Sequence, residues 1–105
     1  KDTIVQVTDA LPVIKKAGYA VNEIEIGMGL PPSVVVHFMY EEGIDDDEKV
    51  KILEELGENK VGTMLLKSLL KATEVQAAIK MGNLKFKEIE VEMSVPPSVT
   101  IKFVE

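Results

Sequence analysis

The segments Glu-Ile-Glu-Ile-Gly-Met (residues 23–28) and Pro-Pro-Ser-Val (residues 31–34) decide the fold of this chain, because both recur 65 residues later. Their second copies read Glu-Ile-Glu-Val-Glu-Met (residues 88–93) and Pro-Pro-Ser-Val (residues 96–99). The shared blocks Glu-Ile-Glu and Pro-Pro-Ser-Val indicate that one structural unit occurs twice. The alternative interpretation is a coincidence between two common hairpin patterns.

The repeat extends beyond these segments without a gap. Residues 8–38 share 12 identities in 31 positions with residues 73–103, where unrelated stretches would share about two. Two copies are too few for a stacked array, which needs about three or more units to bury a continuous core. We therefore expect the two units to face each other across a pseudo-two-fold axis inside one domain.

Each unit is predicted to end in a β-hairpin, because apolar and polar residues alternate with a period of two. In the second copy, the side chains expected on the packed face are Ile89, Val91, Met93, Val99, Ile101 and Phe103. Those expected on the solvated face are Glu88, Glu90, Glu92, Thr100 and Lys102. One covered and one solvated face are typical of an antiparallel sheet. Tandem prolines suit the connections, since proline lacks the N–H that a strand ladder needs.

One register is predicted for both hairpins. Pairing Met28 with Val34 places Glu25 opposite His37, and the same register in the second copy places Glu90 opposite Lys102. Both units then have an acid–base pair on the outer face, which supports the register. Glu25, His37, Glu90 and Lys102 are therefore the charged candidates for an outer-face site.

Three helices are predicted around the hairpins. The first covers residues 8–17, with Thr8 as its N-cap, while residues 3–7 favour a short edge strand because four of the five are β-branched. A short acidic helix opens at Asp45–Asp47 and ends at Gly57. A long helix with a wide apolar stripe covers about residues 60–81.

These elements predict an α+β fold. A four-stranded antiparallel sheet is formed from two repeated αββ units, with the helices packed on its apolar face. Residues 1–105 form a single domain, which comprises unit one (about residues 8–40), an acidic connecting helix (about residues 41–58) and unit two (about residues 59–105). The connecting segment has a net charge of −7 and residues 59–87 one of +5, so we expect these two stretches to neutralise each other.

The composition excludes several classes of function. The chain has 105 residues, 46% of them hydrophobic, with no cysteine, one histidine and a net charge of −6. It therefore has no disulfide framework, thiolate metal site or cysteine nucleophile. All 12 basic residues are lysines, which argues against nucleic-acid binding. No apolar run is long enough to span a bilayer.

No catalytic motif is found in the sequence. The tandem prolines follow Gly27-Met28-Gly29 where a phosphate-binding loop would require a helix, and the acidic run from Asp45 lacks the glycine of a calcium-binding loop. His37 is expected to form a surface cross-strand pair rather than a catalytic centre. No catalytic residue, metal site or cofactor is expected. A hydrolase or transferase that uses the glutamate-lined face is the third hypothesis.

The leading functional hypothesis is a non-enzymatic binding or assembly domain. Its partner would be another protein or a second copy of the chain, as a homodimer, because the apolar stripe of the long helix is wide for one small sheet. Peripheral membrane contact is not expected, since Glu74 interrupts the lysines of that helix. The alternative is a carrier or sensor of a small apolar ligand held between sheet and helices. Its candidate lining residues are Met28, Phe38, Met64, Met81, Met93 and Phe103.

Overall fold

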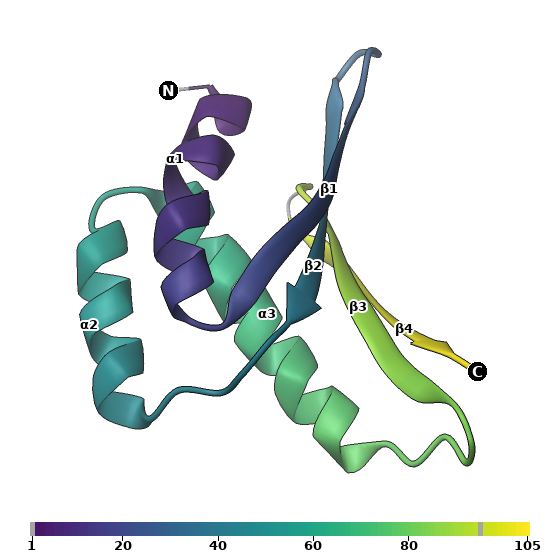
Figure 1. Cartoon of the computed structure of the whole chain (residues 1–105). Helices are drawn as coiled ribbons and strands as arrows, with labels where there is room; N and C mark the ends of the chain where they lie inside the picture. The colour runs from purple at the N-terminus through teal and green to yellow at the C-terminus, as the bar shows by residue number, and fades with distance from the viewer. Residues whose placement is uncertain (1, 95) are drawn as a thin grey trace.

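The computed structural model describes residues 2–94 and 96–105 (Figure 1). Lys1 and Val95, the latter within the second predicted connection, lie outside the described residues. In chain order the elements are α1 (Thr3–Lys16), β1 (Tyr19–Gly27), β2 (Ser33–Tyr40), α2 (Asp46–Leu56), α3 (Lys60–Ala78), β3 (Lys85–Glu92) and β4 (Ser98–Val104).

The predicted α+β class and the four-stranded antiparallel sheet are confirmed. The strands lie in the order β1-β2-β3-β4, and each is antiparallel to its neighbours. Helices α1 and α3 pack on the sheet, and α2 packs against these two helices (Figure 1). Helix α1 contacts β1, whereas α3 contacts β3 and β4, so each hairpin is covered by the helix that precedes it in the chain.

The two hairpins are not related by the two-fold axis that we expected. A two-fold axis normal to the sheet would make β1 and β3 run in opposite directions, but two antiparallel steps make them parallel. An axis along the strands would place α1 and α3 on opposite faces, whereas these helices contact each other (Figure 1). The second hairpin is therefore related to the first by a translation across the sheet, with both hairpins running in the same direction. The duplication itself stays a prediction.

The predicted register is wrong in both hairpins. Ile26 lies opposite Val34 and Ile24 opposite Val36, whereas we expected Met28 to lie opposite Val34. The turn begins one residue earlier, and Met28 enters the loop, where it is 92% exposed. An alternation of period two cannot distinguish registers that differ by two residues, because both place the same side chains on each face.

The two hairpins nevertheless share one register when the numbering is shifted by 65. Glu23 lies opposite His37 in the first hairpin, and Glu88 lies opposite Lys102 in the second. Each first strand also contains one extra residue that interrupts the pairing. These bulges fall between Val21 and Glu23 in β1 and between Phe86 and Glu88 in β3. Their equivalent positions are what a duplicated unit would produce.

Residues 3–7 form the beginning of α1, so the strand expected there is wrong. Asp2 rather than Thr8 caps the helix, and its carboxylate accepts a hydrogen bond from the backbone of the first turn at 2.7 Å. Pro12 lies inside the helix, where its ring is exposed. The buried side chains of α1 are Val7, Ala10 and Ile14. Their burial at helical spacing outweighs the strand preference of the β-branched residues.

The other two helices follow the prediction closely. Asp45 caps α2, and Gly57, with a φ of 54°, follows its last residue. Helix α3 ends at Ala78, slightly before the predicted end near residue 81. In the part of the chain that the structure describes, no helix has both the length and the apolarity needed to cross a membrane.

The lysines of α3 do not neutralise the acidic α2, as the charge pattern had led us to expect. Among residues 2–94 and 96–105, the ion pair that joins α2 to another element is that of Glu55 with Lys16 of α1, at 2.9 Å. Lys60, Lys67 and Lys71 of α3 form no ion pair within these residues. Three cations therefore remain uncompensated along α3.

The core lies between the helices and the two central strands. Val36 of β2 pairs with Val91 of β3, and Phe38 pairs with Ile89. All four side chains have 0% exposure, and burial of each contributes about 1.5–3 kcal/mol. They pack with other core residues, among them Leu65, Leu66 and Leu69 of α3.

A row of aromatic rings crosses all four strands. Successive ring centroids are 5.5, 6.3 and 6.2 Å apart along the series Tyr19, Tyr40, Phe86 and Phe103. The buried Tyr19 hydroxyl lies 2.6 Å from the Thr73 hydroxyl of α3. This contact ties the start of β1 to the middle of the long helix.

Helices α1 and α3 approach each other at a glycine. A Cβ atom built on Gly62 would lie 2.7 Å from the Ala10 Cβ, a distance at which something must shift. Neither group is the end of a flexible side chain that could rotate away. Asn59, the cap of α3, adds a hydrogen bond to the carbonyl of Gln6 at 2.8 Å.

We expect Gly62→Ala to lower the free energy of unfolding by about 1–3 kcal/mol, because overpacking outweighs the better helix propensity of alanine. Chemical denaturation followed by circular dichroism measures this change. Ala10→Gly makes room for the added methyl group, so in that background Gly62→Ala is expected to cost less. Equal costs in both backgrounds would contradict a direct contact between the two positions.

Candidate functional site

Two features of the structure contain the four charged candidates named from the sequence and one of the apolar candidates, Met64. The first, the charged cluster, consists of Glu25, His37, Glu88, Glu90 and Lys102 on the sheet face away from the helices. The second, the α3–β4 groove, lies between the long helix and the last strand. Each strand contributes to the first feature, and the second lies at one edge of the sheet.

His37 is at the centre of the charged cluster. Its Nδ1 lies 2.8 Å from Glu88 Oε2 and its Nε2 lies 2.5 Å from Glu25 Oε1, while Glu90 Oε1 is 3.6 Å from Nδ1. Lys102 Nζ is 3.1 Å from both Glu88 Oε2 and Glu90 Oε1. His37 on β2 thus links carboxylates of β1 and β3, and Lys102 on β4 contacts two carboxylates of β3.

The inner members of this cluster are buried although no helix covers this face. His37 and Glu88 are each 5% exposed, because the long side chains of the neighbouring strands surround them. Asn22 Nδ2 lies 3.4 Å from Glu88 Oε1. No buried side-chain nitrogen or oxygen in the described residues lacks a hydrogen-bond partner.

The electrostatic environment favours the charged forms of both residues. The hydrogen bond from Glu88 raises the pKa of His37 above its usual 6.5, against the opposing effect of desolvation, and Glu25 acts in the same direction as Glu88. The hydrogen bond to His37 lowers the pKa of Glu88 from 4.5 to about 2, with Lys102 and Asn22 adding to it against desolvation.

This geometry leaves His37 little capacity for chemistry. Both ring nitrogens face carboxylates, so both donate hydrogen bonds as an imidazolium and neither offers a lone pair to a substrate proton or a metal. Two groups of potential ligand atoms lie within 4.8 Å of one another, namely Glu23, Glu25 and His37, and His37, Glu88 and Glu90. A cation there would have to displace the His37 proton and compete with Lys102. The arrangement therefore acts as an ion network that joins the strands.

The structure brings the four predicted charged residues together and forms both predicted side-chain pairs, Glu25 with His37 at 2.5 Å and Glu90 with Lys102 at 3.1 Å, although neither acid lies directly opposite its cation. Directly opposite His37 is Glu23, and directly opposite Lys102 is Glu88. Glu25 and Glu90 reach the cations from neighbouring positions. The sequence placed Glu88 on the solvated face but not among the charged candidates, and its burial was not expected.

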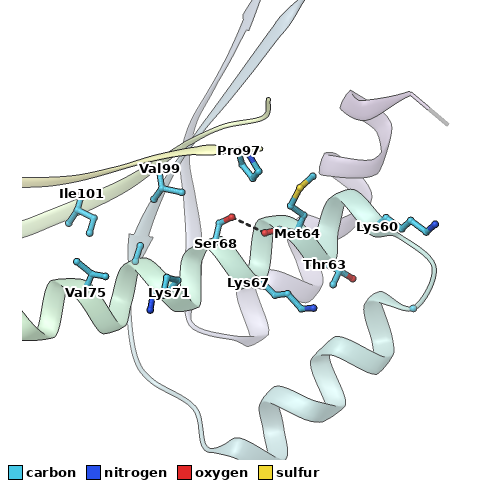
Figure 2. Close-up of a pocket in the computed structure, with 12 residues that line it drawn as sticks. Lys60, Thr63, Met64, Lys67, Ser68, Lys71, Val75, Pro97, Val99 and Ile101 are labelled. Atoms are coloured by element: carbon cyan, nitrogen blue, oxygen red, sulfur yellow. Dashed lines mark hydrogen bonds between the residues drawn. The ribbon is translucent and has the colours of Figure 1, made fainter. Parts of the chain in front are cut away.

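The α3–β4 groove has a volume of about 770 Å³. Its lining residues on α3 and the adjacent turn are Gly57, Lys60, Thr63, Met64, Lys67, Ser68, Lys71, Ala72 and Val75, and those on the last hairpin are Pro97, Val99 and Ile101. Figure 2 shows Met64, Ser68 and Val75 directed toward the last hairpin, and the three lysines spaced along the helix. The groove thus combines an apolar interior with a cationic border.

Of the apolar ligand-lining candidates, one, Met64, lines this groove. Phe38 is fully buried in the core, and Phe103 belongs to the aromatic row. Met28 and Met81 are exposed, at the first hairpin loop and beyond the end of α3, and Met93 packs against the edge of the core. The structure therefore does not gather the methionines around one space.

Comparison of this chain with models of protein families, with curated proteins and with solved structures finds no match to any of them.

We expect the single histidine to titrate above pH 6.5, because its protonated form is held by carboxylates. A pH series of NMR spectra that follow the imidazole carbons measures this pKa without ambiguity. Glu88→Gln removes the largest contribution and is expected to lower the pKa of His37. A wild-type value at or below 6.5 would contradict the imidazolium bridge.

The same shifts predict how stability depends on pH. The contribution of His37 is complete below about pH 6.5 and is lost as the pH rises through its raised pKa, while that of Glu88 is complete above about pH 4.5 and is lost as the pH falls towards 2. Denaturation midpoints are therefore expected to decline above pH 6.5 in the wild type. The matched variant His37→Gln is expected to lack this alkaline decline.

Proposed function

We propose that this chain is a non-enzymatic assembly domain that binds a second copy of itself through an open edge of its sheet. The edge consists of β4 together with the part of α3 that borders the groove. The observation that carries the proposal is the exposure of apolar side chains next to unpaired strand backbone. The following features of the edge support it.

Strand β4 has a neighbour on one side only, since β3 pairs with it and the strand order ends there. A row of backbone N–H and C=O groups therefore faces away from the sheet, and such a row is a template for pairing with another strand. Soluble domains commonly protect such edges with charge or a covering element. Here α3 leaves a groove instead.

The side chains beside this free backbone are apolar. Val99 of β4 and Val75 of α3 both line the groove, and each is 38% exposed. Contiguous apolar surface rimmed by polar groups is characteristic of interaction sites. Because the three lysines on this side of α3 form no ion pair within the described residues, the surface also favours an acidic partner. The chain itself is acidic, with a net charge of −6.

We expect Val99→Glu to reduce self-association strongly, because it places a charge in the apolar part of the edge. Sedimentation velocity over a concentration series measures the association of the wild type and of the variant. Val50→Glu is the matched control, since Val50 is 54% exposed on α2 and lies away from the edge. A wild-type protein that remains a monomer at millimolar concentration would reject the proposal.

The groove also supports a second candidate, a carrier or sensor of a small anionic amphiphile. An apolar tail would lie against Met64 and Val99, and its anionic head would meet Lys60, Lys67 or Lys71. This candidate is favoured by the apolar interior and the unpaired lysines together.

We expect Lys67→Glu combined with Lys71→Glu to weaken binding of a fluorescent long-chain carboxylate at least about tenfold, because the charge of the groove border is reversed. Fluorescence titration measures the change. Lys80→Glu is the control, since Lys80 is exposed but does not line the groove. Equal binding by all three proteins, or no binding by the wild type, would reject this second candidate.

A further inference from the structure

The junction between the two hairpins shows how two copies of this unit join. At this junction β2 pairs with β3 through Val36 opposite Val91 and Phe38 opposite Ile89 on the helical face. On the other face His37 lies opposite Glu90. Two apolar pairs and one cation–carboxylate pair therefore define the contact.

The two free edges of the sheet carry the same pattern. A shift of 65 residues relates β4 to β2, and β3 to β1, with the same register and the same bulge in both hairpins. Ile101 and Phe103 of β4 thus occupy the positions of Val36 and Phe38. On β1 the equivalents of Ile89, Glu90 and Val91 are Ile24, Glu25 and Ile26.

We propose that β4 of one chain pairs with β1 of the next in the register of the internal junction, so that the sheet continues from copy to copy. Ile101 then lies opposite Ile26, Phe103 opposite Ile24, and Lys102 opposite Glu25. This inference rests on the proposed self-assembly and specifies its geometry. Strand direction is correct, because β1 is antiparallel to β4 when one copy follows the other by a step across the sheet.

The exposure of these residues supports the pairing. Ile24 and Ile26 are 37% and 46% exposed at the β1 edge, whereas their equivalents Ile89 and Val91 are fully buried at the junction. Ile101 and Phe103 are partly exposed, while Val36 and Phe38 are not. Pairing of the edges would remove this apolar surface from water in the way that the junction already does.

Charge selects the mixed pairing over pairing of like edges. Strand β4 contains Lys102 and no acid, and β1 contains Glu23 and Glu25 and no base. Two β1 edges would bring carboxylates together, and two β4 edges would offer Lys102 no carboxylate from the partner strand. Opposite charges across a strand pair are favourable, and like charges are not.

The spacing of the helices is compatible with this continuation. Adjacent strands lie about 4.8 Å apart and packed helices about 8–10 Å apart, so one helix fits over each hairpin. Helix α1 contacts β1, and α3 contacts β3 and β4. In the extended sheet, α1 of the following copy would therefore lie beside α3 of the first copy and would occupy the α3–β4 groove.

Such a contact is heterologous, because different surfaces of the two chains meet. Repetition of a heterologous contact produces rings or open filaments, whereas an isologous contact stops at a dimer. The assembly is therefore expected to grow beyond two copies, in contrast to the homodimer suggested by the sequence.

Disulfide trapping tests the register, and the chain has no cysteine of its own. Ile26→Cys and Ile101→Cys are made as separate variants, mixed in equal amounts at a concentration where sedimentation shows association, and oxidised mildly. Opposite residues of antiparallel strands have Cα atoms about 4.5–5.5 Å apart, within the range of a disulfide. We expect about tenfold more mixed disulfide than either homodisulfide, where random collision gives about twofold. Val50→Cys mixed with Ile101→Cys is the control and is expected to give the random ratio.

The outcomes separate the inference from the proposed function. Predominant Ile101→Cys homodisulfides, or association without a mixed disulfide, would overturn the head-to-tail register and leave self-assembly standing. A monomeric wild type without any cross-link would overturn both.

Edge-blocked variants provide a second measurement that needs no cysteine. Val99→Glu blocks β4 and Ile24→Glu blocks β1, so each alone is expected to be monomeric, and their mixture is expected to form one-to-one dimers and nothing larger. Circular dichroism verifies that each variant is folded. Ile24→Glu that associates like the wild type would overturn the inference.

Discussion

The pairing of β2 with β3 is the constraint on which the rest of the structure depends. It joins two hairpins that are far apart in the sequence, and it does so through four register positions, from Val35 opposite Glu92 to Phe38 opposite Ile89. On the helical face the side chains at these positions that belong to the core have no exposed surface. On the other face they bring His37 within reach of Glu88 and Glu90. The hydrophobic core and the charged cluster are thus two sides of one strand contact.

The sequence was sufficient for the fold class, because the alternation in residues 23–28 and 88–93 and the stripe of the long helix are strong periodic signals. It was not sufficient for the register or the strand order. The alternation is unchanged by a shift of two residues, and the bulges at Asn22 and Lys87 have no signature in residue type. The pairing of β2 with β3 is a long-range contact that no local pattern encodes.

The candidate site was predictable only in part, for related reasons. Glu25, His37, Glu90 and Lys102 were identifiable as one charged face because side-chain direction follows from the alternation alone. The burial of Glu88 depends on the packing of four strands, and this packing depends on the bulges. The groove arises from the position of α3 relative to β4. Among the residues that the structure describes, its lysines have no ion pair because α2 forms its ion pair with α1, through Glu55 and Lys16, and not with α3. Neither relation is a property of one segment.

The bulges give the strands a tolerance that the rest of the sheet lacks. Asn22 and Lys87 stand outside the ladder, so the loss of either residue would leave the pairing on both sides in step. A deletion of Glu25 would instead reverse the direction of the side chain that follows it, so that Ile26 would leave the helical face of the sheet. The bulge is therefore the place in each hairpin where the loss of one residue leaves the facing of the other side chains unchanged.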